Sequence, residues 1–140
     1  MPLTAATKRR REVPLILLVE DHLDTRQMYA EFLGMGFEVL TAPDGEQALE
    51  AVRLHRPDLL ITDLSLPGID GFELIAQVRQ DPSLRGMPII CLSGYGGHIY
   101  EERAEAAGCD RILLKPCMPD TLAEVAAELI QDAANRRTKS

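Results

Sequence analysis

The sequence lacks an apolar run long enough to cross a membrane, since a spanning helix needs about 18 such residues in succession. The basic residues Lys8, Arg9, Arg10 and Arg11 are not followed directly by a long apolar stretch. We therefore expect neither a secretory signal nor a membrane partner. The chain has 140 residues, of which 46% are hydrophobic, and this is about the size of one globular domain.

Cysteine is also scarce, and basic residues are outnumbered by acidic ones. The three cysteines, Cys91, Cys109 and Cys117, are an odd number without metal-site spacing. We interpret them as reduced structural thiols of a cytoplasmic protein, with Cys91 as a small buried hydrophobic residue. The 22 acidic and 15 basic residues give a net charge of -7, which argues against general nucleic-acid binding because that needs a clustered basic face. The short basic ends, residues 8–11 and 136–139, are predicted to be solvated tails.

Aliphatic runs predict the strands of a parallel sheet. A strand that is apolar at successive positions, rather than at alternate ones, is covered on both faces, as in parallel sheets. Four such runs are residues 15–19, 59–62, 89–92 and 112–114. Residues 37–41 alternate more and suit an edge strand.

Amphipathic stretches between these runs predict five helices. Asp24, Asp44 and Asp70 are expected to cap the first three. The first helix would place Met28, Phe32 and Leu33 inward and would end at Gly34 or Gly36. The fourth would run from about Ile99 to Ala107, and the fifth would follow Pro119. Repeated strand–helix alternation indicates one α/β domain over residues 14–134, between tails at 1–13 and 135–140.

Five reactive side chains fall at the ends of the predicted strands. Glu20 and Asp21 follow the first, Asp63 the third, Ser93 the fourth and Lys115 the fifth. In doubly wound sheets the site lies beyond the carboxyl ends of the strands, so these groups are expected to converge. Crowded carboxylates without histidine or cysteine suit a hard ion such as Mg²⁺. A carboxylate can also attack phosphorus to give an aspartyl phosphate, whose oxygens the metal, Lys115 and Ser93 would stabilise.

With these motifs the chain resembles a response-regulator receiver domain of two-component signalling, like those of chemotaxis. The matching segments are LLVED at 17–21, DLSLPGIDG at 63–71, LSG at 92–94 and KP at 115–116. The resemblance implies a flavodoxin-like, doubly wound fold of five parallel strands in the order 2-1-3-4-5.

The resemblance also implies roles for individual residues. Asp63 corresponds to the phosphoacceptor, and with Asp21 and the backbone carbonyl of Ser65 it would bind Mg²⁺ directly, while Glu20 would act through water. Ser93 and Lys115 correspond to the hydroxyl and the lysine that contact the phosphoryl group, and the bond from Lys115 to Pro116 is cis in the family.

The implied function is a signalling phosphoacceptor, not an enzyme in the ordinary sense. A sensor histidine kinase or a histidine phosphotransfer protein would supply the phosphoryl group, and the domain would then control a downstream protein partner. A weak homodimer is a further option.

Two positions depart from the family pattern. Ile112 replaces a frequent strand-5 aromatic residue that reports phosphorylation, and Gly94 stands where alanine is frequent. We therefore expect Ser93 to pull the pliable loop 94–97 inward and to re-aim Tyr95.

Three other functions are weighed against this one. A flavodoxin-like cofactor site needs a phosphate-binding loop after strand 1, where Glu20 and Asp21 would repel phosphate. An aspartyl-nucleophile phosphatase or dehalogenase would need an acid two residues after the nucleophile, where this chain has Ser65. A degenerate receiver, acting as a phosphorylation-independent interaction module, is the remaining alternative.

Overall fold

The computed structural model describes residues 12–94 and 96–139. Five parallel strands form one sheet in the order β2-β1-β3-β4-β5, which confirms the predicted fold and strand order. The strands are β1 (Leu15–Val19), β2 (Glu38–Ala42), β3 (Leu59–Asp63), β4 (Ile89–Ser93) and β5 (Arg111–Leu114). The helices are α1 (Leu23–Leu33), α2 (Gly45–His55), α3 (Gly71–Gln80), α4 (His98–Ala107) and α5 (Pro119–Lys139), with a short 3₁₀ turn, η1 (Pro82–Leu84).

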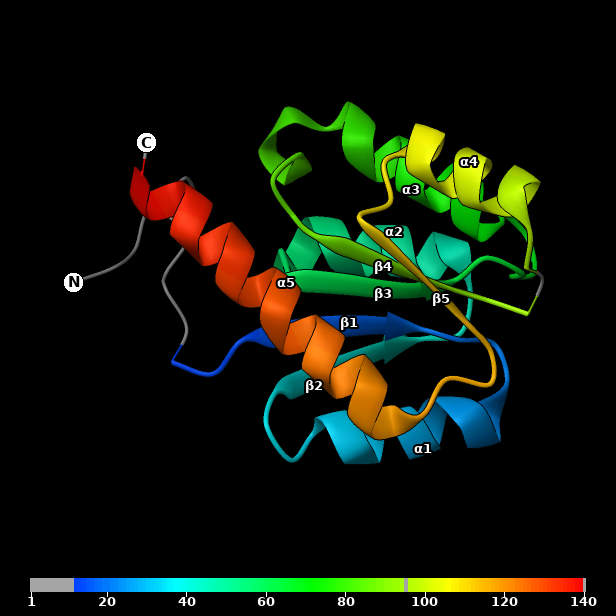
Figure 1. Ribbon diagram of the computed structural model, residues 1–140, viewed down its shortest axis with the longest axis horizontal. Helices are drawn as coiled ribbons and strands as arrows, with labels where there is room; N and C mark the ends of the chain where they lie inside the picture. Colours follow the sequence, from blue (N-terminus) through cyan, green and yellow to red (C-terminus); the bar gives the residue numbers. More distant parts are fainter. Residues whose placement is uncertain (1–11, 95, 140) are drawn as a thin grey trace.

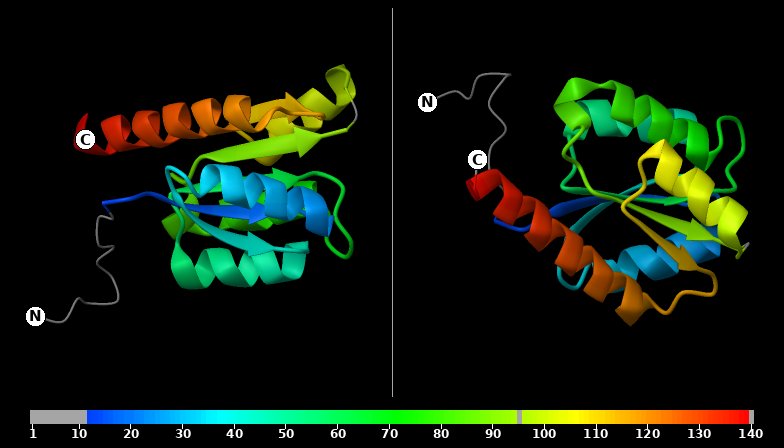
Figure 2. Two further views of the ribbon diagram at one scale, coloured as in Figure 1. Left: turned by 90° about the horizontal axis from the view of Figure 1, so that it is seen from below. Right: turned by 45° about the horizontal axis from the view of Figure 1, so that its top comes forward.

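The sheet is the middle of three layers. Helices α1 and α5 cover one face and α2, α3 and α4 cover the other (Figures 1 and 2). Each face has its own apolar core, one around Leu18 and Ile61 and the other around Leu17 and Leu60. Neighbouring residues of one strand thus enter opposite cores, and for this reason β1 is apolar at every position and β3 is apolar at its first three. Cys91 is fully buried, as predicted, and all three cysteines are free thiols.

None of the helices in the described part of the chain is long and apolar enough to span a membrane.

Helix α1 differs from its predicted form. Its N-cap is His22, whose side chain accepts a hydrogen bond from the backbone N–H of Thr25, and the expected cap Asp24 lies inside the first turn. A carboxylate there is favourable because it faces the positive end of the helix dipole. Tyr29 is buried, whereas Met28, predicted to point inward, is 42% exposed. The predicted caps Asp44 and Asp70 are confirmed for α2 and α3.

The two predicted tails are only partly described by the structure. The basic residues 8–11 lie outside the described residues. At the other end α5 continues to Lys139, so residues 135–139 prolong a helix beyond the expected boundary at 134. Arg136 and Arg137 are exposed on its last turns, in keeping with a solvated basic end.

Arg79 fixes the amino-terminal ends of β4 and β5. Its guanidinium donates hydrogen bonds to the carbonyl oxygens of Met87, at 2.7 Å, and Gly108, at 2.9 and 3.0 Å. It also pairs with Asp110 at 3.1 Å, and the same carboxylate accepts the backbone N–H of Ile89 at 2.8 Å. A planar donor with several N–H groups can hold these elements together, which sets the positions of the two strands.

Gly71 allows α3 to begin directly against the end of β3. A Cβ atom at this position would lie 2.4 Å from the carbonyl oxygen of Asp63 and 2.7 Å from the Cα of Leu64. Both are backbone atoms, so the clash could be relieved only by moving the chain that carries Asp63. The close approach is held by a 3.0 Å hydrogen bond from the Gly71 N–H to the Leu64 carbonyl.

We expect Gly71→Ala to destabilise the domain by about 1–3 kcal/mol, the usual cost of overpacking. Thermal unfolding would show Tm lowered by about 4 °C for each kcal/mol in a domain of this size. Gly36→Ala is the matched control, because nothing lies within 4 Å of a Cβ atom built there. Equal melting temperatures for the two variants would contradict the close-approach argument.

Candidate functional site

The parallel sheet brings all five predicted side chains to one rim. Asp63 and Ser93 are the last residues of β3 and β4, and Glu20 and Lys115 directly follow β1 and β5. In register, Asp63 pairs with Leu92 and Ser93 with Leu114, so successive strands end at nearly the same level. The arrowheads of the strands in Figure 1 point toward this rim. Asp21 completes the set as the residue after Glu20.

Lys115 bridges two buried carboxylates at the centre of the rim. Its Nζ lies 2.8 Å from Glu20 Oε1 and 2.5 Å from Asp63 Oδ2. Glu20 is only 1% exposed and Asp63 only 5% exposed. Because a buried charge without a partner is costly, the ammonium group is the partner that compensates the two carboxylates beneath the surface.

Backbone groups fix the orientation of the same side chains. The N–H of His22 donates to Glu20 Oε2 at 3.1 Å, and the N–H of Ser65 donates to Asp63 Oδ1 at 3.0 Å. The N–H of Lys115 donates to the Ser93 carbonyl at 2.7 Å, which joins the end of β5 to the end of β4. Each carboxylate therefore has one oxygen held by the backbone and the other held by Lys115.

Burial and pairing shift two pKa values at the rim. Burial raises the pKa of Glu20 above its ordinary value of 4.5, against the opposing effect of its hydrogen bond from Lys115. Burial alone would lower the pKa of Lys115, but its hydrogen bonds to Asp63 and Glu20 outweigh burial and raise that pKa above 10.5. Lys115 is therefore a cation at neutral pH.

The acids fit a hard divalent cation. Glu20, Asp21 and Asp63 offer oxygen atoms that all lie within 4.8 Å of one another. Three carboxylates face one ammonium group, so the cluster keeps excess negative charge, and its donors are oxygens alone. Oxygen ligands with room for water are the set that Mg²⁺ prefers. The donor chemistry thus agrees with the predicted metal.

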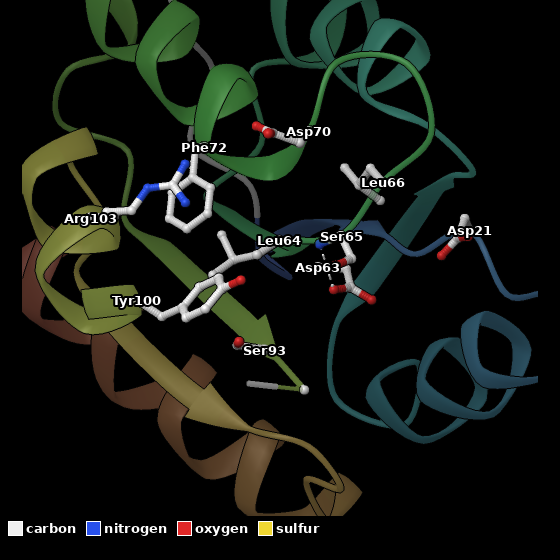
Figure 3. A pocket seen from close by; sticks show the side chains of 11 residues that line it. Asp21, Asp63, Leu64, Ser65, Leu66, Asp70, Phe72, Ser93, Tyr100 and Arg103 are labelled. Carbon is white, nitrogen blue, oxygen red and sulfur yellow. Dashed lines mark hydrogen bonds between the residues drawn. The ribbon is translucent and has the colours of Figure 1, made fainter. Parts of the chain in front are cut away.

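Figure 3 shows the pocket around this rim. Asp21 and Asp63 line it beside the segment from Leu64 to Leu66, and Ser93 lies at the end of β4. Ser93 is 2% exposed, whereas Ser65 is exposed. The metal contact predicted for the Ser65 carbonyl remains a prediction.

Comparison with known proteins agrees with this geometry. The family model described as the response regulator receiver domain matches residues 16–127. This chain belongs to the response regulator receiver domain family.

Relatives and solved structures align with this chain over nearly their full length. The polar-differentiation response regulator DivK of Brucella anthropi is 29% identical over 119 residues, covering 84% of this chain and 97% of the relative. The structure of the chemotaxis response regulator CheY4 of Vibrio cholerae aligns with a TM-score of 0.79 at 30% identity, over 84% of this chain and 98% of that one. A CheY-like receiver domain protein of Methanospirillum hungatei aligns with a TM-score of 0.83 at 25% identity, over 89% and 99%.

Several residues of this receiver domain's site were not predicted from the sequence. Arg26 donates to the backbone carbonyl of Glu20 at 2.9 Å and lies one turn inside α1, a spacing that could have suggested the contact. The Tyr29 hydroxyl donates to the Cys117 carbonyl at 2.7 Å, which ties α1 to the loop after Lys115. Phe72, Tyr100 and Arg103, from α3 and α4, line the far part of the pocket, and no local pattern indicates this.

The pKa of Glu20 predicts a pH-dependent effect of Glu20→Gln in metal-free buffer. A raised pKa means that the folded state holds this proton more tightly than the unfolded state, so the ionised side chain costs stability as pH rises above about 4.5. The neutral amide removes this cost. We therefore expect the Tm of the variant, relative to wild type, to increase from pH 4.5 to pH 7 by a few degrees, at about 4 °C per kcal/mol.

The matched control is Glu124→Gln, which removes an equal charge from an exposed position on α5. Its Tm difference from wild type should not show the same rise over this range. A difference for Glu20→Gln that is constant, or that falls toward pH 7, would contradict the assigned direction.

Proposed function

We propose that this receiver domain accepts a phosphoryl group on Asp63 in a Mg²⁺-dependent reaction and thereby controls a partner protein. The observation that carries the proposal is the Lys115 ammonium group, which lies within hydrogen-bonding distance of both Glu20 and Asp63. Asp63 therefore sits beside a fixed cation at the rim of an open pocket. This is the environment that a carboxylate nucleophile for phosphorus needs.

The chain's own groups can perform each part of the transfer. An Asp63 carboxylate oxygen attacks phosphorus, and the bond from phosphorus to the donor's leaving atom breaks with its electron pair going to that atom. Lys115 then pairs with a phosphoryl oxygen, and the buried Ser93 hydroxyl donates to another. A bound Mg²⁺, held by Asp21 and Asp63 with the Ser65 carbonyl and with Glu20 through water, would neutralise charge on the phosphoryl oxygens.

Receiver domains work with histidine kinases or phosphotransfer proteins, and we propose a donor of this class here. A receiver that had become a pure interaction module would have no need to keep all five groups. This chain has every one of them, and all lie at one rim. The chemistry of the rim therefore favours the phosphorylatable form over the degenerate alternative.

We propose that phosphorylation reaches the surface through β4 and the following loop. The buried Ser93 would move toward the phosphoryl group and draw Gly94 with it. Ile112 is half-buried against the core and, being β-branched, is stiff about χ1, so it is poorly suited to a rotamer switch. Tyr95, which we expected to be re-aimed, lies outside the described residues.

Asp63→Asn should reduce labelling by a small phosphodonor such as acetyl phosphate to background, because the amide is not a nucleophile toward phosphorus. Labelling of wild type should also fall to background when EDTA removes Mg²⁺. Intact-protein mass spectrometry, which detects the added phosphoryl mass, measures both effects. Asp24→Asn, an exposed acid in the first turn of α1, is the control and should be labelled like wild type. Persistent labelling of Asp63→Asn would overturn the assignment.

A further inference from the structure

The pocket extends well beyond the place where a phosphoryl group on Asp63 would lie. It is a single cavity of about 460 Å³, open to solvent. Asp63 lines one end, and Phe72, Tyr100 and Arg103 line the far end. Figure 3 shows the two ends, with Leu64 lying between Tyr100 and Asp63. The far end therefore brings aromatic and cationic side chains to the same pocket as Asp63.

The far end is an aromatic surface that carries a cation. The rings of Phe72 and Tyr100 have centroids 6.2 Å apart and planes tilted by 31°. The guanidinium carbon of Arg103 lies 4.0 Å from the centroid of the Phe72 ring. Tyr100 and Arg103 are three residues apart on α4, so they project from the same side of the helix. Stacking on the ring holds the guanidinium at the pocket without using its N–H donors.

The charge of Arg103 is not balanced within the described part of the chain, where no acidic side chain forms an ion pair with it. Asp70, which also lines the pocket, is engaged as the N-cap of α3 and accepts the Glu73 N–H at 2.9 Å. The far end thus offers exposed N–H donors and a positive charge. These groups suit a small planar anion, above all a carboxylate, which a guanidinium can bind with two parallel hydrogen bonds.

We propose that Phe72, Tyr100 and Arg103 form a subsite for the leaving carboxylate of a small acyl phosphate. The inference rests on the proposed phosphorylation of Asp63 and adds to it a preference among donors. Phosphoryl transfer expels the leaving group on the side of phosphorus away from the attacking oxygen. In this pocket the space away from Asp63 is the part that contains the aromatic and cationic side chains.

The charge changes of the reaction explain why Arg103 matters for this donor class. When Asp63 attacks an acyl phosphate, the bond between phosphorus and the bridging acyl oxygen breaks and its electron pair stays on that oxygen. The product is a carboxylate that needs no proton. Negative charge grows on it in the transition state, where a guanidinium stabilises it more than in the ground state. In phosphoramidate the nitrogen is already protonated before transfer, so when the bond between phosphorus and nitrogen breaks, its electron pair stays on nitrogen. The group departs as neutral ammonia, which gains little from Arg103.

The experiment measures the initial rate of Asp63 labelling with acetyl phosphate and with phosphoramidate, each with Mg²⁺, for wild type and Arg103→Ala. We expect the ratio of the acetyl phosphate rate to the phosphoramidate rate to fall about threefold to fivefold in the variant, the size typical of a charge contact at an exposed side chain. Arg103→Lys keeps the charge but not the planar fork, and it should recover part of the ratio.

Arg111→Ala is the matched control, since it removes the same charge from β5, where Arg111 pairs with Glu128 at 3.7 Å outside the pocket. Its rate ratio should equal that of wild type. An unchanged ratio in Arg103→Ala, or an equal fall for both donors, would overturn the subsite while the phosphorylation of Asp63 stands. Failure of both donors to label wild type would overturn the proposed function and the subsite together.

Discussion

The site depends on one ammonium group placed between two buried acids. Lys115 reaches Glu20 from β1 and Asp63 from β3, although it follows β5, the strand at the edge of the sheet. The contact therefore joins three strands at their carboxyl ends. Without it the rim would hold buried negative charges with no cation among its own side chains, which a folded domain tolerates poorly. The reactivity we propose for Asp63 and the electrostatic balance of the rim thus have the same origin.

The parallel sheet makes this contact possible because the carboxyl ends of its strands lie together at one edge. The apolar runs of β1, β3 and β4 carried enough information to predict the strands, because a strand covered on both faces is apolar at successive positions until it reaches the rim. The residues at the predicted strand ends, including Asp63 and Ser93, were then expected to lie together at the rim. This part of the prediction is strong because it needs only the chain direction of parallel strands. It does not depend on how any helix is rotated.

The features that could not be predicted from the sequence depend on how each helix is rotated and on which of several neighbouring residues caps it. His22 caps α1 where Asp24 was expected, and an error of one residue in helix phase exchanges the exposed Met28 for the buried Tyr29. The contact of Arg103 with Phe72 joins α4 to α3, and its existence depends on how these two helices pack. No pattern within either helix reports that packing. The pocket's far end was therefore visible only in the structure.

The most direct test of the central claim is a crystal structure of the domain with Mg²⁺ and beryllofluoride, a phosphoryl mimic. The account predicts beryllium bonded to a carboxylate oxygen of Asp63, with Lys115 Nζ and Ser93 Oγ within hydrogen-bonding distance of its fluorine atoms. It also predicts that Lys115 keeps its contact with one of the two acids. Beryllofluoride bound at another residue, or an Asp63 that stays unmodified with Mg²⁺ bound beside it, would contradict the account.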